Sequence, residues 1–133
     1  MLDINLFVYG TLLGGQSSHG LLRNPVFVGE AYLSGYSLYD LGDYPGIVEA
    51  SFQDRVLGEV YRINATLLPE LDRYEDEGDL YTRKVLEVTL SDRTRILAET
   101  YVYNLPVDPK ALIPLDRQPY GILTLGTKPF NQA

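Results

Sequence analysis

One carboxylate of this chain falls on the apolar face of a helix predicted over residues 64–75. On a helical wheel that starts at Leu67, Leu71 lies at about 40°, Leu68 at about 100° and Tyr74 at about −20°, and this arc is the predicted buried stripe. Glu75 lies at about 80°, between the two leucines, so its side chain points toward the core. A buried carboxyl group without a partner has a raised pKa, and in a pocket it can act as a general acid or base. The alternative is that Glu75 lies at a frayed last turn and bends out to solvent.

A second candidate site is the turn that ends the first apolar strand, within residues 6–12. Gly10 lets the backbone turn where a Cβ atom would clash. The amides of Thr11 and Leu12 are then free of any strand ladder and can converge on one point. Such an anion nest suits a carboxylate or a phosphate, whereas the simpler interpretation is a plain turn from strand to loop.

Other charged residues surround the end of the predicted helix: Asp72, Asp76, Glu77 and Asp79. They lack the glycine-centred spacing of a calcium loop, and we interpret them as a solvated helix end with no metal bound. Arg83 follows Tyr81 by two positions, on the same face of a predicted strand. Arg83 either pairs with a helix acid or faces a substrate carboxylate, and we expect the ion pair.

Composition narrows the class of protein. The chain has 133 residues, which predicts one domain, 1–133, and its net charge of −7 with scattered basic residues argues against nucleic-acid binding. No apolar stretch is long enough to span a membrane, and the start lacks a secretory signal, so we expect a cytoplasmic protein. The absence of cysteine excludes disulfides and a thiol nucleophile. The single histidine, His19, makes histidine metal sites and a Ser-His-Asp triad poor candidates, and we expect it on the solvated surface.

The elements that must position these residues are short strands around one helix. Thr66 is the predicted cap of the helix, Pro69 fits its first turn, and Gly78 is its predicted stop. Glycines inside two strands, Gly29 and Gly58, indicate a strongly curved sheet or a small barrel. Strands are predicted at residues 25–33, 36–41, 47–50, 56–63, 81–90 and 95–103, and the proline-rich tail from about residue 105 is expected to pack on the body.

Four segments stand in an order that resembles a known family. They are the Tyr-Gly-Thr-Leu turn at 9–12, Tyr-Pro-Gly at 44–46, Gly-Glu-Val-Tyr at 58–61, and Leu-Asp-Arg-Tyr-Glu at 71–75 followed by Tyr-Thr-Arg at 81–83. Together they resemble the γ-glutamylcyclotransferase-like superfamily, in particular its short γ-glutamylamine cyclotransferase and AIG2-like members, over residues 5–104. The resemblance implies an α+β fold: a small mixed, barrel-like β-sheet with one main helix and a pocket at one end.

The resemblance also implies roles for individual residues. The backbone amides of Gly10, Thr11 and Leu12 would hold the α-carboxylate of a γ-glutamyl group, and Glu75 would be the catalytic acid/base. Three tyrosines would contribute to substrate binding: Tyr9, Tyr44 and Tyr81.

The implied reaction needs no cofactor and no metal. The substrate is a small γ-glutamyl amide, whose α-amine attacks its own γ-carbonyl and releases 5-oxoproline and a free amine. Two other interpretations stay open. One is a binding module that senses a carboxylated metabolite without catalysis. The other is a carboxylate-dependent hydrolase such as a glycosidase, which needs two opposed carboxylates, whereas Glu75 alone lies on the apolar stripe.

Overall fold

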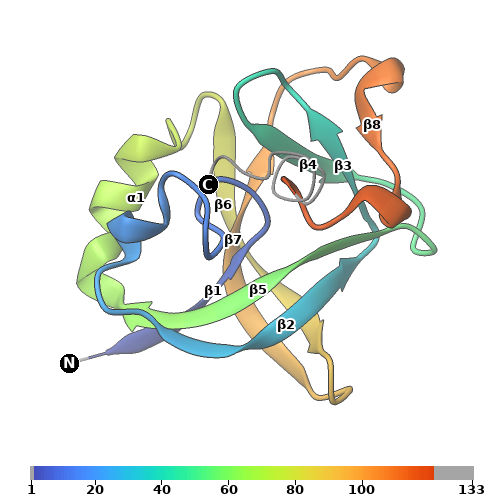
Figure 1. Cartoon of the computed structure of the whole chain (residues 1–133). Helices are drawn as coiled ribbons and strands as arrows, with labels where there is room; N and C mark the ends of the chain where they lie inside the picture. The colour runs from blue at the N-terminus through green and yellow to red at the C-terminus, as the bar shows by residue number, and fades with distance from the viewer. Residues whose placement is uncertain (1, 122–133) are drawn as a thin grey trace.

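The computed structural model describes residues 2–121 of the chain. Five strands close into a barrel, α1 lies to its left and a second sheet lies at the upper right (Figure 1). In order around the barrel, the strands are β1 (Asp3–Val8), β5 (Arg55–Asn64), β2 (Val26–Ser34), β6 (Tyr81–Leu90) and β7 (Arg95–Tyr103).

The barrel is mixed because its closing pair is parallel. β1 runs antiparallel to β5 and parallel to β7, and the remaining neighbours are antiparallel. The predicted α+β fold, a small mixed, barrel-like sheet with one main helix, is therefore confirmed.

Two glycines let the barrel curve. The register between β2 and β5 shifts between Phe27 and Gly29, which is the irregularity that Gly29 predicted. At Gly58, a Cβ atom would lie 2.2 Å from the carbonyl oxygen of Val8 and 2.8 Å from the Phe7 ring. Only glycine fits at this position of β5, because any Cβ atom would clash with the paired strand β1.

The second sheet comprises β4 (Pro45–Glu49), β3 (Tyr36–Asp40) and β8 (Leu112–Ile113). β8 belongs to the proline-rich tail, which also contains 3-10 turns at Pro109–Ala111 and Leu115–Arg117. The buried Gln118 side chain accepts the Leu57 amide hydrogen bond at 2.8 Å and donates to the Ile113 carbonyl at 3.1 Å. The described part of the tail thus packs on the body, while the apolar residues that suggested this at 122, 123 and 125 lie outside the described residues.

β1 lies between two hydrophobic clusters. Phe7, and Tyr9 just after β1, pack into a cluster that the barrel shares with β3 and β4, whereas Leu6 and Val8 pack into the cluster shared with the helix. Successive side chains on a strand point to opposite faces, so a strand that is buried on both sides reads as a continuous apolar run. The two clusters meet where β1 ends, and the predicted turn at Gly10 starts there.

The helical segment is capped two residues before the predicted cap. Asn64 is the cap, because its Oδ1 accepts hydrogen bonds from the Thr66 amide at 2.9 Å and the Thr66 hydroxyl at 2.8 Å. The prediction that Thr66 caps the helix is wrong: a 3-10 turn (Ala65–Leu67) precedes α1 (Leu68–Tyr74) and takes up Thr66. Pro69 occupies the first turn of α1, as predicted.

The residue with positive φ that stops the helix is an aspartate, Asp76, rather than the predicted glycine, Gly78. Asp76 has φ of 53°, and the Glu77 amide donates to the Asp72 carbonyl at 2.8 Å, which completes a Schellman motif. Gly78 has φ of 97° but serves the next turn, so its assignment as the helix stop is wrong. Consequently Glu75 is the C-cap residue of α1. Within residues 2–121, no helix is long and apolar enough to cross a membrane.

Candidate active site

One cavity of about 210 Å³ contains all the site residues that the sequence predicted. Glu75, the turn residues Gly10, Thr11 and Leu12, and the tyrosines Tyr9, Tyr44 and Tyr81 line its wall. The wall also includes six residues that were not predicted: Phe7, Val8, Pro45, Tyr74, Leu80 and Tyr101. The cavity therefore joins the end of β1, the end of α1 and the starts of β4 and β6.

The turn after β1 presents unused backbone amides. The carbonyls of Gly10 and Thr11 accept hydrogen bonds from the Leu13 amide at 2.9 Å and the Ser18 amide at 2.8 Å. Among the hydrogen bonds of residues 2–121, none uses the amides of Gly10, Thr11 or Leu12 as donors. Three consecutive free amides on the wall of a cavity can donate hydrogen bonds to an anion such as a carboxylate.

Gly10 is required by its neighbour rather than by its torsion angle. A Cβ atom at this position would lie 2.6 Å from Cγ of Pro45, the first residue of β4. The predicted clash thus exists, and its source is the second sheet.

The loop that follows the turn is fixed to the barrel. Glu59 Oε1 accepts hydrogen bonds from the Gly14 amide at 2.9 Å and from the Tyr61 hydroxyl at 3.0 Å. Burial raises the pKa of Tyr61 to about 12, and the bond to Glu59 adds to this. His19 Nδ1 lies 2.8 Å from the Leu12 carbonyl oxygen, and the His19 ring packs edge-on against Tyr61. His19 is half-buried in this loop, so its prediction as a solvated surface residue is wrong.

Glu75 is a partly buried carboxylate without a polar partner in the described chain. No hydrogen bond or ion pair within residues 2–121 involves its side chain. Burial raises its pKa from the ordinary 4.5 to about 7. The carboxyl group faces the cavity and does not bend out to solvent, so at neutral pH it can both accept and donate a proton.

The tyrosines form the wall around Glu75. Tyr9 donates to the Tyr101 carbonyl at 2.6 Å, and Tyr81 donates to the Pro45 carbonyl at 2.7 Å. Burial raises the pKa of Tyr9 and Tyr81 well above the ordinary value for tyrosine, and the charge of Glu75 adds to the effect in both. The Tyr44 ring packs on Tyr81 with the centroids 6.3 Å apart. The phenols of Tyr9 and Tyr81 are neutral and donate to backbone oxygens, which suits a wall rather than a proton-transfer group.

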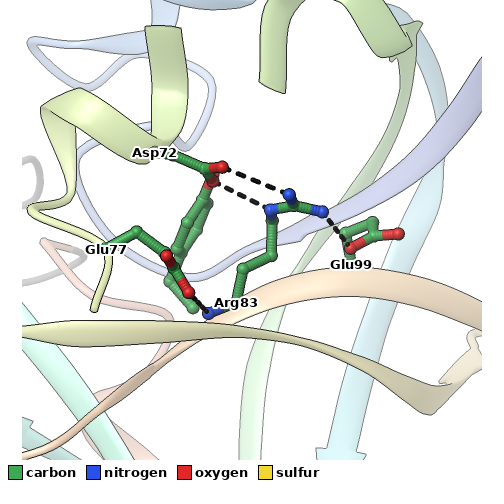
Figure 2. A network of polar contacts seen from close by, with 5 residues as sticks. Asp72, Glu77, Arg83 and Glu99 are labelled. Atoms are coloured by element: carbon green, nitrogen blue, oxygen red, sulfur yellow. Dashed lines mark hydrogen bonds and ion pairs between the residues drawn. The ribbon is translucent and has the colours of Figure 1, made fainter. Parts of the chain in front are cut away.

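A second acid of the helix, Asp72, lies in a polar network rather than in solvent. Figure 2 shows the guanidinium of Arg83 between Asp72 and Glu99. Arg83 Nε lies 2.8 Å from Asp72 Oδ1, and Arg83 Nη1 lies 2.9 Å from Glu99 Oε1. Asp72 also accepts a second Arg83 hydrogen bond at 3.1 Å and the Tyr101 hydroxyl at 2.7 Å. Burial alone would raise the pKa of Asp72, but the bonds from Arg83 and Tyr101 outweigh it and lower this pKa. The predicted Arg83 ion pair is confirmed, while the prediction that Asp72 is part of a solvated helix end is wrong.

Tyr74 is the site residue that the sequence placed in the wrong surroundings. The helical wheel puts it on the apolar stripe, but its side chain is 45% exposed at the cavity mouth. Its hydroxyl oxygen lies 3.0 Å from Thr11 Oγ1 and also contacts Ser18 Oγ. Two hydroxyl-bearing residues at positions 11 and 18 of the loop were the only signal in the sequence for this contact.

Among residues 2–121, no group of three or more acidic, histidine or cysteine side chains could hold a metal ion.

Comparisons with known proteins show the family to which this chain belongs. The sequence model of the γ-glutamyl cyclotransferase, AIG2-like family matches residues 6–120, and the chain belongs to this family, as the resemblance predicted. The γ-glutamylcyclotransferase family protein ytfP of Citrobacter rodentium is 36% identical over 121 residues, which cover 88% of this chain and 100% of that protein.

A second relative and a solved structure are also similar to this chain. The γ-L-glutamyl-butirosin B γ-glutamyl cyclotransferase of Niallia circulans is 34% identical over 107 residues, covering 75% of this chain and 67% of that protein. The crystal structure of an AIG2-like protein from Mus musculus has a TM-score of 0.72 at 24% identity, covering 84% of this chain and 83% of that one. Family membership supports a cyclotransferase activity that acts on small γ-glutamyl compounds.

Proposed function

We propose that this protein releases 5-oxoproline and a free amine from a small γ-glutamyl amide, with Glu75 as the general acid/base. The amides of Gly10, Thr11 and Leu12 bind the α-carboxylate of the γ-glutamyl group. Tyr9, Tyr44 and Tyr81 enclose the substrate. The reaction uses groups of the chain and of the substrate, without a cofactor or a covalent enzyme intermediate.

In the proposed reaction, the substrate supplies its own nucleophile. The α-amine nitrogen attacks the γ-carbonyl carbon, and a new C–N bond closes the five-membered ring. Glu75 accepts the proton that the attacking nitrogen loses. The original amide C–N bond then breaks, and Glu75 returns the proton to the leaving nitrogen. Binding the α-carboxylate in the nest orients the substrate for this intramolecular attack.

The observation that carries the proposal is that Glu75 and the three free amides line the same cavity. A carboxylate anchored at the amides places the rest of the γ-glutamyl group beside Glu75. A protein that only binds an anion gains nothing from a second, unpaired carboxylate in the same cavity, because like charges repel. The position of Glu75 therefore favours catalysis over a binding module.

The test is 5-oxoproline release from a panel of γ-glutamyl compounds: glutathione, γ-glutamyl-ε-lysine and several γ-glutamyl amino acids. We expect Glu75→Gln to lower the rate by about 10²–10⁴-fold, the range for loss of a general acid/base. Glu70→Gln is the matched control, because Glu70 lies on the same helix and pairs with Arg23 outside the cavity. This control should keep the wild-type rate.

Two results would contradict the proposal. One is a Glu75→Gln variant that keeps the wild-type rate. The other is saturable binding of a γ-glutamyl compound by the wild type with no 5-oxoproline released from any member of the panel, which would indicate the binding module.

A further inference from the structure

Tyr74 connects the two halves of the cavity wall. It is the last residue of α1 and immediately precedes Glu75. Its hydroxyl oxygen contacts Thr11 Oγ1 at 3.0 Å and Ser18 Oγ at 2.5 Å, and both partners belong to the loop that carries the free amides. With 45% of the side chain exposed, burial contributes little to its placement. The hydrogen bonds to the loop determine where this phenol lies.

These contacts are the hydrogen bonds that join the loop of residues 10–18 to α1 within residues 2–121. The other side of the loop is held by the barrel, through the Gly14 amide and Glu59. The loop and the helix also share a hydrophobic cluster, in which Leu12 and Leu13 pack with Leu71. To this non-directional packing, Tyr74 adds the hydrogen bonds that join the end of the helix to the loop.

The end of α1 needs such support. The helix has seven residues, and isolated helices of this length are unstable in water. The Schellman motif closes the backbone of its last turn, but none of the hydrogen bonds of that motif holds the Glu75 side chain. Glu75 lies at this end as the C-cap residue, with no polar partner of its own in the described chain.

We propose that Tyr74 is a positioning residue whose hydroxyl holds the end of α1, and with it Glu75, against the loop that carries the amides of Gly10, Thr11 and Leu12. A phenol has one proton, so Tyr74 donates to one hydroxyl and accepts from the other. The effect of this contact on catalysis rests on the proposed function, while its effect on the position of Glu75 does not.

The surroundings of Glu75 give a direct readout of its position. The charge of Glu75 acts on Tyr9 after β1, Tyr81 on β6 and Tyr101 on β7. The other titratable groups of the cavity wall are Tyr44 and Tyr74. Among the described residues of the cavity wall, none carries a positive charge. Because burial is what raises the pKa of Glu75 to about 7, movement of the helix end toward solvent lowers that pKa.

The experiment is a carbon-13 NMR titration of the carboxyl groups in the wild type, Tyr74→Phe and Ser18→Ala. The Glu75 resonance is assigned by its disappearance in Glu75→Gln. We expect Tyr74→Phe, which keeps the ring and loses the hydroxyl, to lower the pKa of Glu75 by about one unit. Ser18→Ala should lower it by less. The matched control is Tyr32→Phe, since Tyr32 packs under Arg55 outside the cavity, and it should leave the pKa unchanged.

Turnover provides the second readout. If 5-oxoproline is released by the wild type, Tyr74→Phe should lower kcat by about tenfold and raise KM by less, because the substrate still binds but Glu75 is displaced. An unchanged or raised pKa of Glu75 in folded Tyr74→Phe would overturn the inference. If Tyr74→Phe does not fold, the Ser18→Ala titration decides in the same way.

The two proposals fail differently. A lowered pKa of Glu75 in Tyr74→Phe, with no 5-oxoproline from the wild type, supports the positioning role and contradicts the proposed function. An active wild type whose Glu75 pKa does not respond to Tyr74→Phe supports the function and contradicts the positioning role.

Discussion

Asp72 and Glu75 are carboxylates three residues apart at the end of one short helix, and their surroundings are opposite. Asp72 accepts hydrogen bonds from Arg83 and Tyr101, and its pKa is lowered. Glu75 has no polar partner in the described chain, and burial raises its pKa to about 7. The two residue types have nearly the same chemistry in water. The packing around the helix therefore decides which acid stabilises the fold and which can exchange a proton near neutral pH.

Asp72 and Glu75 should therefore contribute to folding stability with opposite dependence on pH. Asp72 stabilises the folded state above the unfolded-state pKa of an aspartate, about 4, and this contribution is lost as pH falls through its lower folded pKa. Glu75 destabilises the folded state when ionised, so its penalty is absent below its ordinary pKa of 4.5, grows as pH rises, and is complete above about 7.

The largest predicted effect follows from Glu75. Glu75→Gln should raise the free energy of unfolding by about 3 kcal/mol at pH 8, because a neutral amide avoids the cost of a buried charge. At pH 4 the variant and the wild type should have nearly equal stability, since the carboxyl group is protonated in both states. Urea unfolding at the two pH values measures this difference. Equal stability at pH 8 would show that Glu75 is solvated.

Arg83→Met tests the other carboxylate and should act in the opposite direction. It leaves Asp72 and Glu99 without their cation, and with side chains about a quarter exposed or less, we expect a loss of about 2 kcal/mol at pH 7. The measurement is again urea unfolding.

Arg95→Met is the control for this variant. Arg95 and Glu87 form an exposed pair at 3.9 Å, so their loss should change stability by less than about 0.5 kcal/mol. An Arg83→Met variant that is no less stable than Arg95→Met would contradict a structural role of the network.

Within the Asp72 network, the smaller predicted effect belongs to Tyr101→Phe. This variant removes one of the hydrogen bonds to Asp72 and leaves those from Arg83, so we expect a loss of about 1 kcal/mol. A double-mutant cycle with Asp72→Asn isolates the contribution of the contact. Additive effects of the two substitutions would show that the Tyr101 hydroxyl does not stabilise Asp72.

The direction of Glu75 could be predicted because helical periodicity holds to the end of α1. The environment of Asp72 could not, because a helical wheel contains no information about what lies opposite. Here β6 crosses beside the helix and brings Arg83 to Asp72. The bounds of β6 and β7 followed from their apolar pattern and from the hairpin between them, and the structure confirms both.

The helix boundaries show a second limit of prediction from the sequence. Asn64 and Thr66 are both good caps, and local preference alone does not choose between them. At the other end, glycine is the usual residue with positive φ, but aspartate tolerates it, so Asp76 takes the position where the hydrogen-bond ladder stops. Tyr74 was assigned to the apolar stripe because the wheel does not show that a loop approaches its hydroxyl group.

The Pro45 contact has a consequence for how this cavity can change. Pro45 opens β4, its ring abuts Gly10, and its carbonyl accepts the Tyr81 hydroxyl. β4 pairs with β3, and β3 pairs with β8 of the tail. A substitution in the tail that shifts this sheet therefore reshapes the cavity from a distance. Under the proposed function, substrate preference can change in this way while Glu75 and the turn of residues 10–12 stay untouched.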